Sequence, residues 1–94
     1  MRINRIIWYS KFVDKLWDKH QVEVHEVEDV MQNYRRVRRV RRGHVKGEDV
    51  YVVLGQTDAG RYLAVFFVYK KTHEAIVIGA RDMDSEERRD YEKA

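Results

Sequence analysis

Three apolar segments separated only by short turns fill most of the second half of the sequence. They are EDVYVVLG at residues 48–55, RYLAVFFVYK at 61–70 and AIVIGA at 75–80. Because links this short join antiparallel neighbours, the segments predict a three-stranded meander. The middle segment is apolar from Tyr62 to Tyr69, which indicates a central strand buried on both faces. The predicted core residues of the meander are Val65, Phe67, Ile76 and Ile78.

Two amphipathic helices are predicted ahead of these strands. After a short β-prone opening at residues 2–9, the hydroxyl of Ser10 is expected to cap a helix over residues 11–20. A second helix is predicted over residues 25–32. The side chains expected to face the sheet recur at helical spacing: Phe12, Val13, Leu16, Trp17 and His20 in the first helix, and Val27, Val30, Met31 and Tyr34 in the second.

The strongest charge feature is a basic segment between residues 35 and 46. It holds six arginines, one lysine and no acid, whereas the other 12 basic residues face 16 acids, so the net charge of +3 conceals a local +7. Val37 and Val40 continue a spacing of three from Tyr34, which leaves a longer helix as an alternative. We expect a break near Asn33 and an exposed edge strand over residues 35–42. Such a basic segment favours binding of a polyanion or of an acidic protein partner.

The end of the chain predicts one more helix and completes the fold class. Asp84 with Glu87 three residues later resembles a capping box. The expected fold is therefore α+β: a small antiparallel sheet, made of the C-terminal meander and edge strands, packed with two N-terminal helices and a short C-terminal helix. A chain of 94 residues has room for a single domain, residues 1–94.

Composition excludes several classes of chemistry. Cysteine is absent, so disulfides, thiolate zinc sites and cysteine nucleophiles are excluded. Neither a phosphate-binding glycine loop nor a nucleophilic serine motif occurs. The four histidines show no metal-ligand spacing, so we expect no metal and no other cofactor. No apolar run approaches about 18 residues and no signal-peptide core is present, which predicts a cytoplasmic protein without a membrane partner.

One reaction needs only the residue types that remain. RNA carries its own nucleophile, the 2′-hydroxyl beside each phosphate. A protein that cleaves RNA in this way has to hold the strand, move protons and neutralise charge on the phosphorane. Suitable side chains occur near the predicted strand ends and in the last helix: Lys70, Lys71, Arg81, Glu87, Arg88 and Tyr91.

Several short motifs resemble those of the BrnT toxin family. They are Trp8, Lys19-His20, Gly55-x-Thr57-x-x-Gly60-Arg61-x-Leu63, Ala80-Arg81, Glu87-Arg88 and Tyr91. Departures occur at Tyr9, Phe12, Leu16 and Gln21, where that family carries aspartate, lysine, asparagine and glycine. The resemblance implies a RelE-like fold and a metal-independent ribonuclease toxin of a type II toxin-antitoxin pair. Such a toxin cleaves RNA, inhibits translation and is bound by a cognate antitoxin.

The hypothesis assigns roles to two sets of residues. The catalytic set is His20, Arg81, Glu87, Arg88 and Tyr91, with His20 as a proton carrier and Glu87 as a base. The RNA-binding set is Lys19, Arg36, Arg38, Arg39, Arg41, Lys70 and Lys71. Two alternatives stay open, namely a non-catalytic nucleic-acid-binding module and a protein-interaction domain that uses the basic 35–46 segment. The oligomeric state is also open, including a homo-oligomer.

Overall fold

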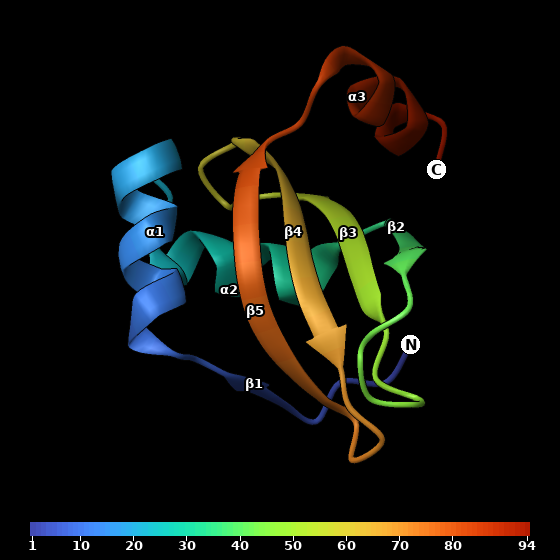
Figure 1. The fold of residues 1–94 in the computed structure, drawn as a ribbon. Coiled ribbons are helices and arrows are strands. Elements are labelled where there is room, and N and C mark those ends of the chain that lie inside the picture. The colour runs from blue at the N-terminus through green and yellow to red at the C-terminus, as the bar shows by residue number, and fades with distance from the viewer.

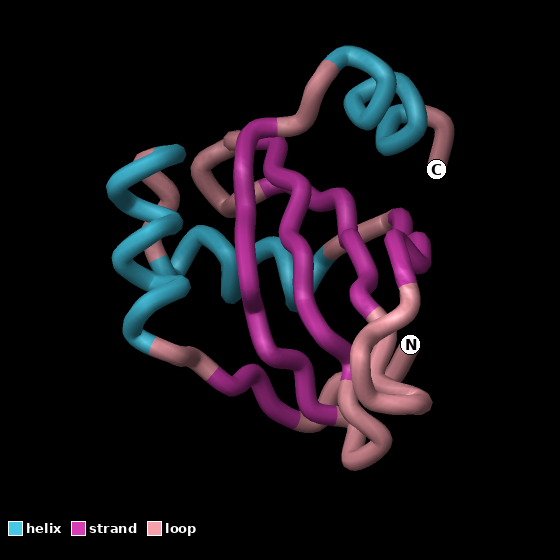
Figure 2. Tube along the Cα trace, in the orientation of Figure 1, coloured by secondary structure: helices cyan, strands magenta, loops and turns pink.

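The computed structural model describes residues 1–94 and contains three helices and five strands (Figures 1 and 2). The elements of the first half are β1 (Arg5–Ile7), α1 (Ser10–His20), α2 (Val24–Asn33) and β2 (Arg36–Arg41). Those of the second half are β3 (Val50–Gln56), β4 (Tyr62–Tyr69), β5 (Glu74–Asp82) and α3 (Ser85–Glu92). The predicted α+β class is confirmed.

The strands form one sheet in the order β1-β5-β4-β3-β2. β3, β4 and β5 pair antiparallel as the predicted meander, with β4 at the centre. β2 is the expected basic edge strand, because the backbone becomes extended at Tyr34 and ends α2 there. β1 pairs in parallel with β5, so the sheet is mixed rather than wholly antiparallel.

The two faces of the sheet are covered unequally. Twelve buried residues from α1, α2, their connection and one sheet face form the main core, in which Val65, Phe67 and Val77 are fully buried. The other face carries a smaller cluster under α3, made of Val52, Leu54, Ala64 and Tyr91. Figure 1 shows α2 behind the sheet, α1 beside β5 and α3 over one end. The rest of this second face, here called the open face, has no helix over it.

The open face explains an error in the predicted core. Strand register places Phe66, Val68 and Ile76 on this face, and all three are only half-buried. Ile76 and Ile78 are therefore not core residues, since the buried positions of β5 are Ala75, Val77 and Ala80. A bulge opposite Phe66 and Phe67 changes the alternation of β5 at this point.

α1 departs from its prediction at both its start and its inner face. Tyr9 occupies the N-cap position and no side chain caps the helix, so the capping role of Ser10 is wrong. Leu16 is the buried residue of the helix, whereas Trp17 is 52% exposed and His20 is exposed. The physical reason is that α1 lies beside β5 and buries only a narrow stripe. The preceding strand is also shorter than residues 2–9.

The connection between β3 and β4 accounts for the Gly-x-Thr-x-x-Gly-Arg motif. The N–H of Thr57 donates to the carbonyl of Arg61 at 2.8 Å, and the Thr57 hydroxyl accepts from the N–H of Arg61 at 2.9 Å. Gly60 has a φ of +100°, a conformation that favours glycine. A Cβ on Gly55 would meet Val30 of α2 at 2.9 Å. The motif therefore closes the turn and lets α2 pack closely on β3.

α3 begins with the predicted capping box. The N–H of Glu87 donates to Asp84 at 2.8 Å, and the N–H of Asp84 donates to Glu87 at 2.9 Å. Glu87 and Tyr91 are both buried, as expected for residues that share one helix face. Among the three helices, none has the length and the apolar character needed to cross a membrane.

Candidate functional site

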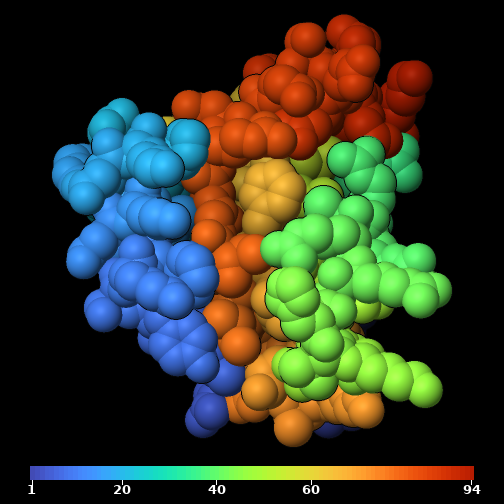
Figure 3. Space-filling view, in the orientation of Figure 1, coloured from blue at the N-terminus to red at the C-terminus, as the bar shows by residue number.

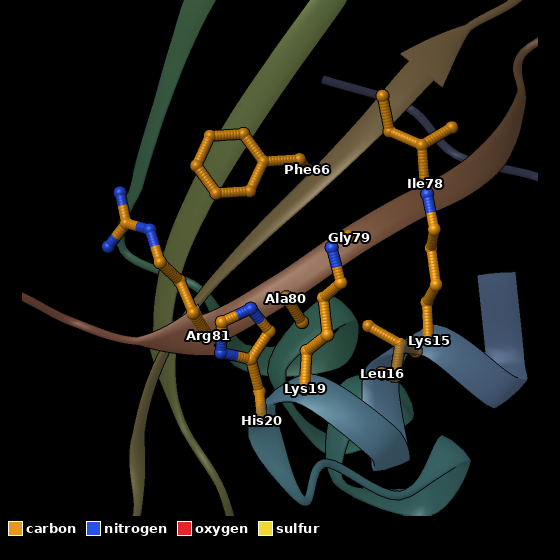
Figure 4. A pocket seen from close by; sticks show the side chains of 9 residues that line it. All are labelled: Lys15, Leu16, Lys19, His20, Phe66, Ile78, Gly79, Ala80 and Arg81. Atoms are coloured by element: carbon orange, nitrogen blue, oxygen red, sulfur yellow. The ribbon is translucent and has the colours of Figure 1, made fainter.

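A cavity of about 240 Å³ lies on the open face between α1 and β5. Figure 4 shows its lining, which comes from three elements. The residues are Lys15, Leu16, Lys19 and His20 of α1, Phe66 of β4, and Ile78, Gly79, Ala80 and Arg81 of β5. Three predicted site residues, Lys19, His20 and Arg81, are thus brought together. The lining contains three cationic side chains, one imidazole and no carboxylate.

The end of α1 determines where its basic side chains lie. Lys15 and Lys19 are one helical turn apart and so share a face, while Leu16 anchors the helix in the core. The helix ends because Gln21 adopts a left-handed conformation with a φ of 49°. This backbone explains why glycine suits the position, although glutamine occupies it here.

Arg61 holds the end of α1 against β5 and α2. Its guanidinium donates to the carbonyls of His20 and Gln21 at 2.9 and 2.8 Å, to Asp82 at 2.8 Å and to Glu26 at 3.2 Å. The hydrogen bond between the side chains of Arg61 and Asp82 raises the pKa of Arg61 and lowers the pKa of Asp82. A cation also suits the unpaired carbonyls at a helix C-terminus. Arg61 therefore fixes the position of His20 relative to β5.

Arg81 and Glu87 form a two-pronged ion pair across the β5–α3 connection. The two N–H···O distances are 2.6 and 3.0 Å, and the hydrogen bond to Glu87 raises the pKa of Arg81. Glu87 is 9% exposed and also accepts from the N–H of Asp84. Arg81 lies inside β5, which extends to Asp82 rather than ending at Ala80, and its guanidinium is paired. With 36% exposure, it still lines the cavity.

Arg88 and Tyr91 belong to a separate cluster beneath α3. The guanidinium carbon of Arg88 lies 3.4 Å from the ring centroid of Tyr62, and its Nε donates to Glu92 at 2.8 Å. Tyr91 is 5% exposed and packs edge-on against Tyr62, with 5.7 Å between the ring centroids. Neither residue lines the cavity. Their contacts hold α3 on the sheet.

The structure separates Lys70 and Lys71 from Lys19 and from the cavity. Antiparallel pairing places the β4–β5 turn at the end of the sheet away from Arg81. The side chain of Lys71 instead lies beside Gly47, in the loop between β2 and β3. Both lysines therefore lie away from the cavity that holds Lys19, His20 and Arg81.

The arginines of β2 fall on both sides of the sheet. Register places Arg36, Arg38 and Arg41 on the open face, and Arg39 on the opposite side. Arg36 pairs with Asp90 at 3.2 Å and Arg39 with Asp49 at 3.4 Å. In Figure 3 the floor made by β4 and β5, in gold and orange, lies between α1 in blue and the β2–β3 segment in green. Arg38 and Arg41 therefore add positive charge on the side of the open face opposite α1. The end of that face between Arg38 and Arg81 also carries four acids, Asp84, Glu86, Glu87 and Asp90.

Three residues that shape the site were missed in the sequence. Lys15 and Phe66 line the cavity, and Arg61 orders the helix that carries His20. The helical spacing of Lys15 and Lys19 could have pointed to Lys15. The place of Arg61 in the hairpin motif could have pointed to Arg61. Nothing distinguished Phe66 from its neighbour Phe67, because both occur in an uninterrupted apolar run. No group of three histidine, aspartate or glutamate side chains is arranged to hold a metal ion.

These features define a class of protein: a small α+β fold with a mixed sheet and a basic cavity between the first long helix and the last strand. A family model described as the ribonuclease toxin BrnT of a type II toxin-antitoxin system matches residues 8–87. The fold is similar to the crystal structure of the Brucella abortus ribonuclease toxin BrnT, with a TM-score of 0.59 and 17% identity over 86% of this chain and 97% of that one. No curated protein matches the sequence. The chain belongs to the BrnT family of ribonuclease toxins of type II toxin-antitoxin systems.

Proposed function

We propose that this chain cleaves single-stranded RNA at the cavity, using the 2′-hydroxyl of the RNA and no metal ion, and that cleavage inhibits translation. The observation that carries the proposal is the shared lining: Lys15, Lys19 and His20 from α1 face the same space as Arg81 from β5. A cluster of cations with no acid in the lining attracts phosphate. Arg38 and Arg41 supply a second basic wall along which the strand would continue.

The proposed reaction needs one proton acceptor and one proton donor. The 2′-oxygen attacks the adjacent phosphorus, so that an O2′–P bond forms and the P–O5′ bond breaks. The products are a 2′,3′-cyclic phosphate and a 5′-hydroxyl. His20 accepts the proton of the 2′-hydroxyl, and the ammonium of Lys19 donates a proton to the leaving 5′-oxygen. Arg81 and Lys15 stabilise the added negative charge of the phosphorane.

Glu87 takes a different role in this scheme from the one expected of it. Its oxygens accept from Arg81 and from the N–H of Asp84, so neither is directed at a substrate hydroxyl. We assign Glu87 as a positioning residue that holds the guanidinium of Arg81 at the cavity. Arg88 and Tyr91 act further away, because they anchor the helix that carries Glu87.

We propose that the protein partner of this chain is a cognate antitoxin. Membership of the family implies an antitoxin as well as an RNA target. β2 is an edge strand whose outer side pairs with no other strand, and its Val37 and Val40 are 41% and 46% exposed. An extended segment with acidic side chains suits this edge, because it can pair with the backbone and neutralise the arginines. An antitoxin bound there would also cover one wall of the RNA path.

Cleavage in EDTA tests the proposed reaction. We expect the wild-type protein to cut single-stranded RNA in EDTA and to leave a 2′,3′-cyclic phosphate. A single 2′-deoxy substitution at the cut site should abolish that cut, because it removes the nucleophile. Binding of RNA without cleavage would instead support a non-catalytic RNA-binding module.

Arg81→Lys tests the site in the same assay. Lysine keeps the charge but cannot reproduce the planar two-pronged contact, so we expect a rate loss of about 10²–10³. Arg5→Lys is the matched control, since Arg5 also pairs with a carboxylate, Glu74, but lies outside the cavity, and it should keep most of the activity. A folded Arg81→Lys protein that cleaves at the wild-type rate would exclude the proposed site.

A further inference from the structure

Phe66 occupies the floor of the cavity and is the only phenylalanine, tyrosine or tryptophan in its lining. The ring is half-buried, and it packs on the small cluster of Val52, Leu54, Ala64 and Tyr91 beneath the open face. Its neighbour Phe67 is fully buried on the opposite face. Phe66 is therefore a large apolar ring that the sheet turns toward solvent at the functional site (Figure 4).

The space over Gly79, the residue that pairs with Phe66, is open. Strand pairing places Gly79 directly opposite Phe66, and a Cβ added to Gly79 would meet no atom within 4 Å. The guanidinium carbon of Arg81 lies 5.3 Å from the Phe66 ring centroid. A flat group could thus lie on the ring, next to Gly79, while remaining close to a cation.

The remaining lining residues supply charge around this apolar floor. Lys15, Lys19 and His20 reach the same cavity from α1, and the lining has no carboxylate. A ligand that contacts both parts of the lining needs an anionic group to pair with the cations and an aromatic plane to stack on the Phe66 ring. A nucleotide unit of a single strand has both, whereas bases in a duplex are stacked on one another and are not available. An acidic peptide would satisfy the cations but would leave the ring uncovered.

Resting on the proposed RNA cleavage, we propose that Phe66 is the floor of a nucleobase subsite, on which one unpaired base of the RNA stacks while the adjacent phosphate binds Lys15, Lys19 and Arg81. The subsite makes an unstacked base a requirement for binding. It also sets the register of cleavage, because the phosphate in the cavity is the one next to the stacked base.

The test is a binding cycle between the ring and the base. The probe is a single-stranded oligonucleotide with 2′-O-methyl groups, which cannot be cleaved, and one base at a time is replaced by an abasic unit or by 2-aminopurine. Phe66→Leu keeps an apolar cover on the cluster but removes the aromatic plane. Phe66→Tyr restores the plane. Phe12→Leu is the matched control, because Phe12 is also half-buried beside a cation, Lys11, but lies outside the cavity.

We expect Phe66→Leu to weaken binding of the intact probe by roughly 5- to 150-fold, the range for loss of one stacked base. Phe66→Tyr should restore affinity and Phe12→Leu should not change it. One abasic position should weaken wild-type binding by a similar factor and have little further effect in Phe66→Leu. At that position, 2-aminopurine fluorescence should be quenched by the wild-type protein and not by Phe66→Leu.

Two results would overturn the subsite. One is wild-type affinity in a folded Phe66→Leu protein, and the other is additivity of the abasic and Phe66→Leu effects at every position. If Phe66→Leu does not fold, the absence of any abasic-sensitive, quenched position in the wild-type protein overturns it equally. Failure of the proposed cleavage is distinguishable, because the unmodified strand would then stay intact while the base still stacked on Phe66.

Discussion

At the scale of single residues, Arg61 shows how a side chain outside the cavity can control it. It holds two successive carbonyls at the end of α1 and a carboxylate on each of β5 and α2. His20 belongs to the same helix end, so its place in the cavity depends on these contacts. A lysine has no planar fork and cannot bridge all of these acceptors at once.

Arg61→Lys should therefore lower cleavage more than its effect on stability explains. We expect a rate loss of about 10²-fold, the size produced by an ångström-scale displacement of a catalytic group. Arg5→Lys provides the control, because Arg5 of β1 pairs with Glu74 of β5 but is 69% exposed and lies outside the cavity. The measurements are cleavage rates and melting temperatures of both variants. Equal rates for Arg61→Lys and Arg5→Lys would mean that Arg61 stabilises the β3–β4 turn but does not position His20 for cleavage.

At the scale of elements, β2 contributes charge through its pairing with β3. Arg38 and Arg41 form no ion pair and share the open face with Arg81, while Arg39 lies on the other side and contacts Asp49. Two phosphate contacts are thus expected from this strand, and neither depends on the core.

Replacing Arg38 and Arg41 with glutamine should weaken RNA binding and flatten its dependence on salt. The slope of log K against log salt should decrease by about 0.7 for each phosphate contact that is lost. The melting temperature should change little, because both side chains are exposed. Arg39→Gln is the control with a smaller expected effect. If the double variant kept the wild-type slope, β2 would not contact the RNA phosphates, and antitoxin binding would be its only proposed role.

Elements that depend on local sequence signals were predicted correctly. The meander, the break near Asn33 and the Asp84 capping box depend on turn length and capping residues, and all three occur. The errors involve α1 and β5, where burial depends on what lies opposite. Periodicity could not show that α1 sits beside the sheet and leaves Trp17 exposed, nor that one face of β5 has no helix over it.

The candidate site was predictable only in part, for a related reason. The Lys19-His20 and Ala80-Arg81 pairs were identified, and they meet because α1 packs along β5. The capping contact of Glu87 was expected from the Asp84 capping box, but its pairing with Arg81 was not. Lys70 and Lys71 were misplaced because residue type alone does not tell which end of a hairpin faces the site.

At the scale of the whole molecule, the sheet divides stability and function between its two faces. One face closes against α1 and α2 around the main core. The other is open between α1, which carries Lys15 and Lys19, and β2, which places Arg38 and Arg41 on this face and Arg39 on the opposite one. Adjacent residues of β4 belong to different faces, and two phenylalanines side by side allow the division to be measured.

Phe67→Ala and Phe66→Ala should separate the two roles. Phe67 is fully buried against the helices, so its loss leaves a closed void and should reduce the free energy of unfolding by about 3–5 kcal/mol. Phe66 is half-buried on the open face, where water can fill the space, and its replacement should reduce that free energy by at most about half as much. Urea unfolding of both variants gives the comparison.

RNA binding, measured at urea concentrations well below each unfolding midpoint, should follow the opposite order, with the larger loss of affinity in Phe66→Ala. If the two variants were equally unstable, the open face would have to be closed in solution, and neither the cavity nor its aromatic floor would be accessible to RNA.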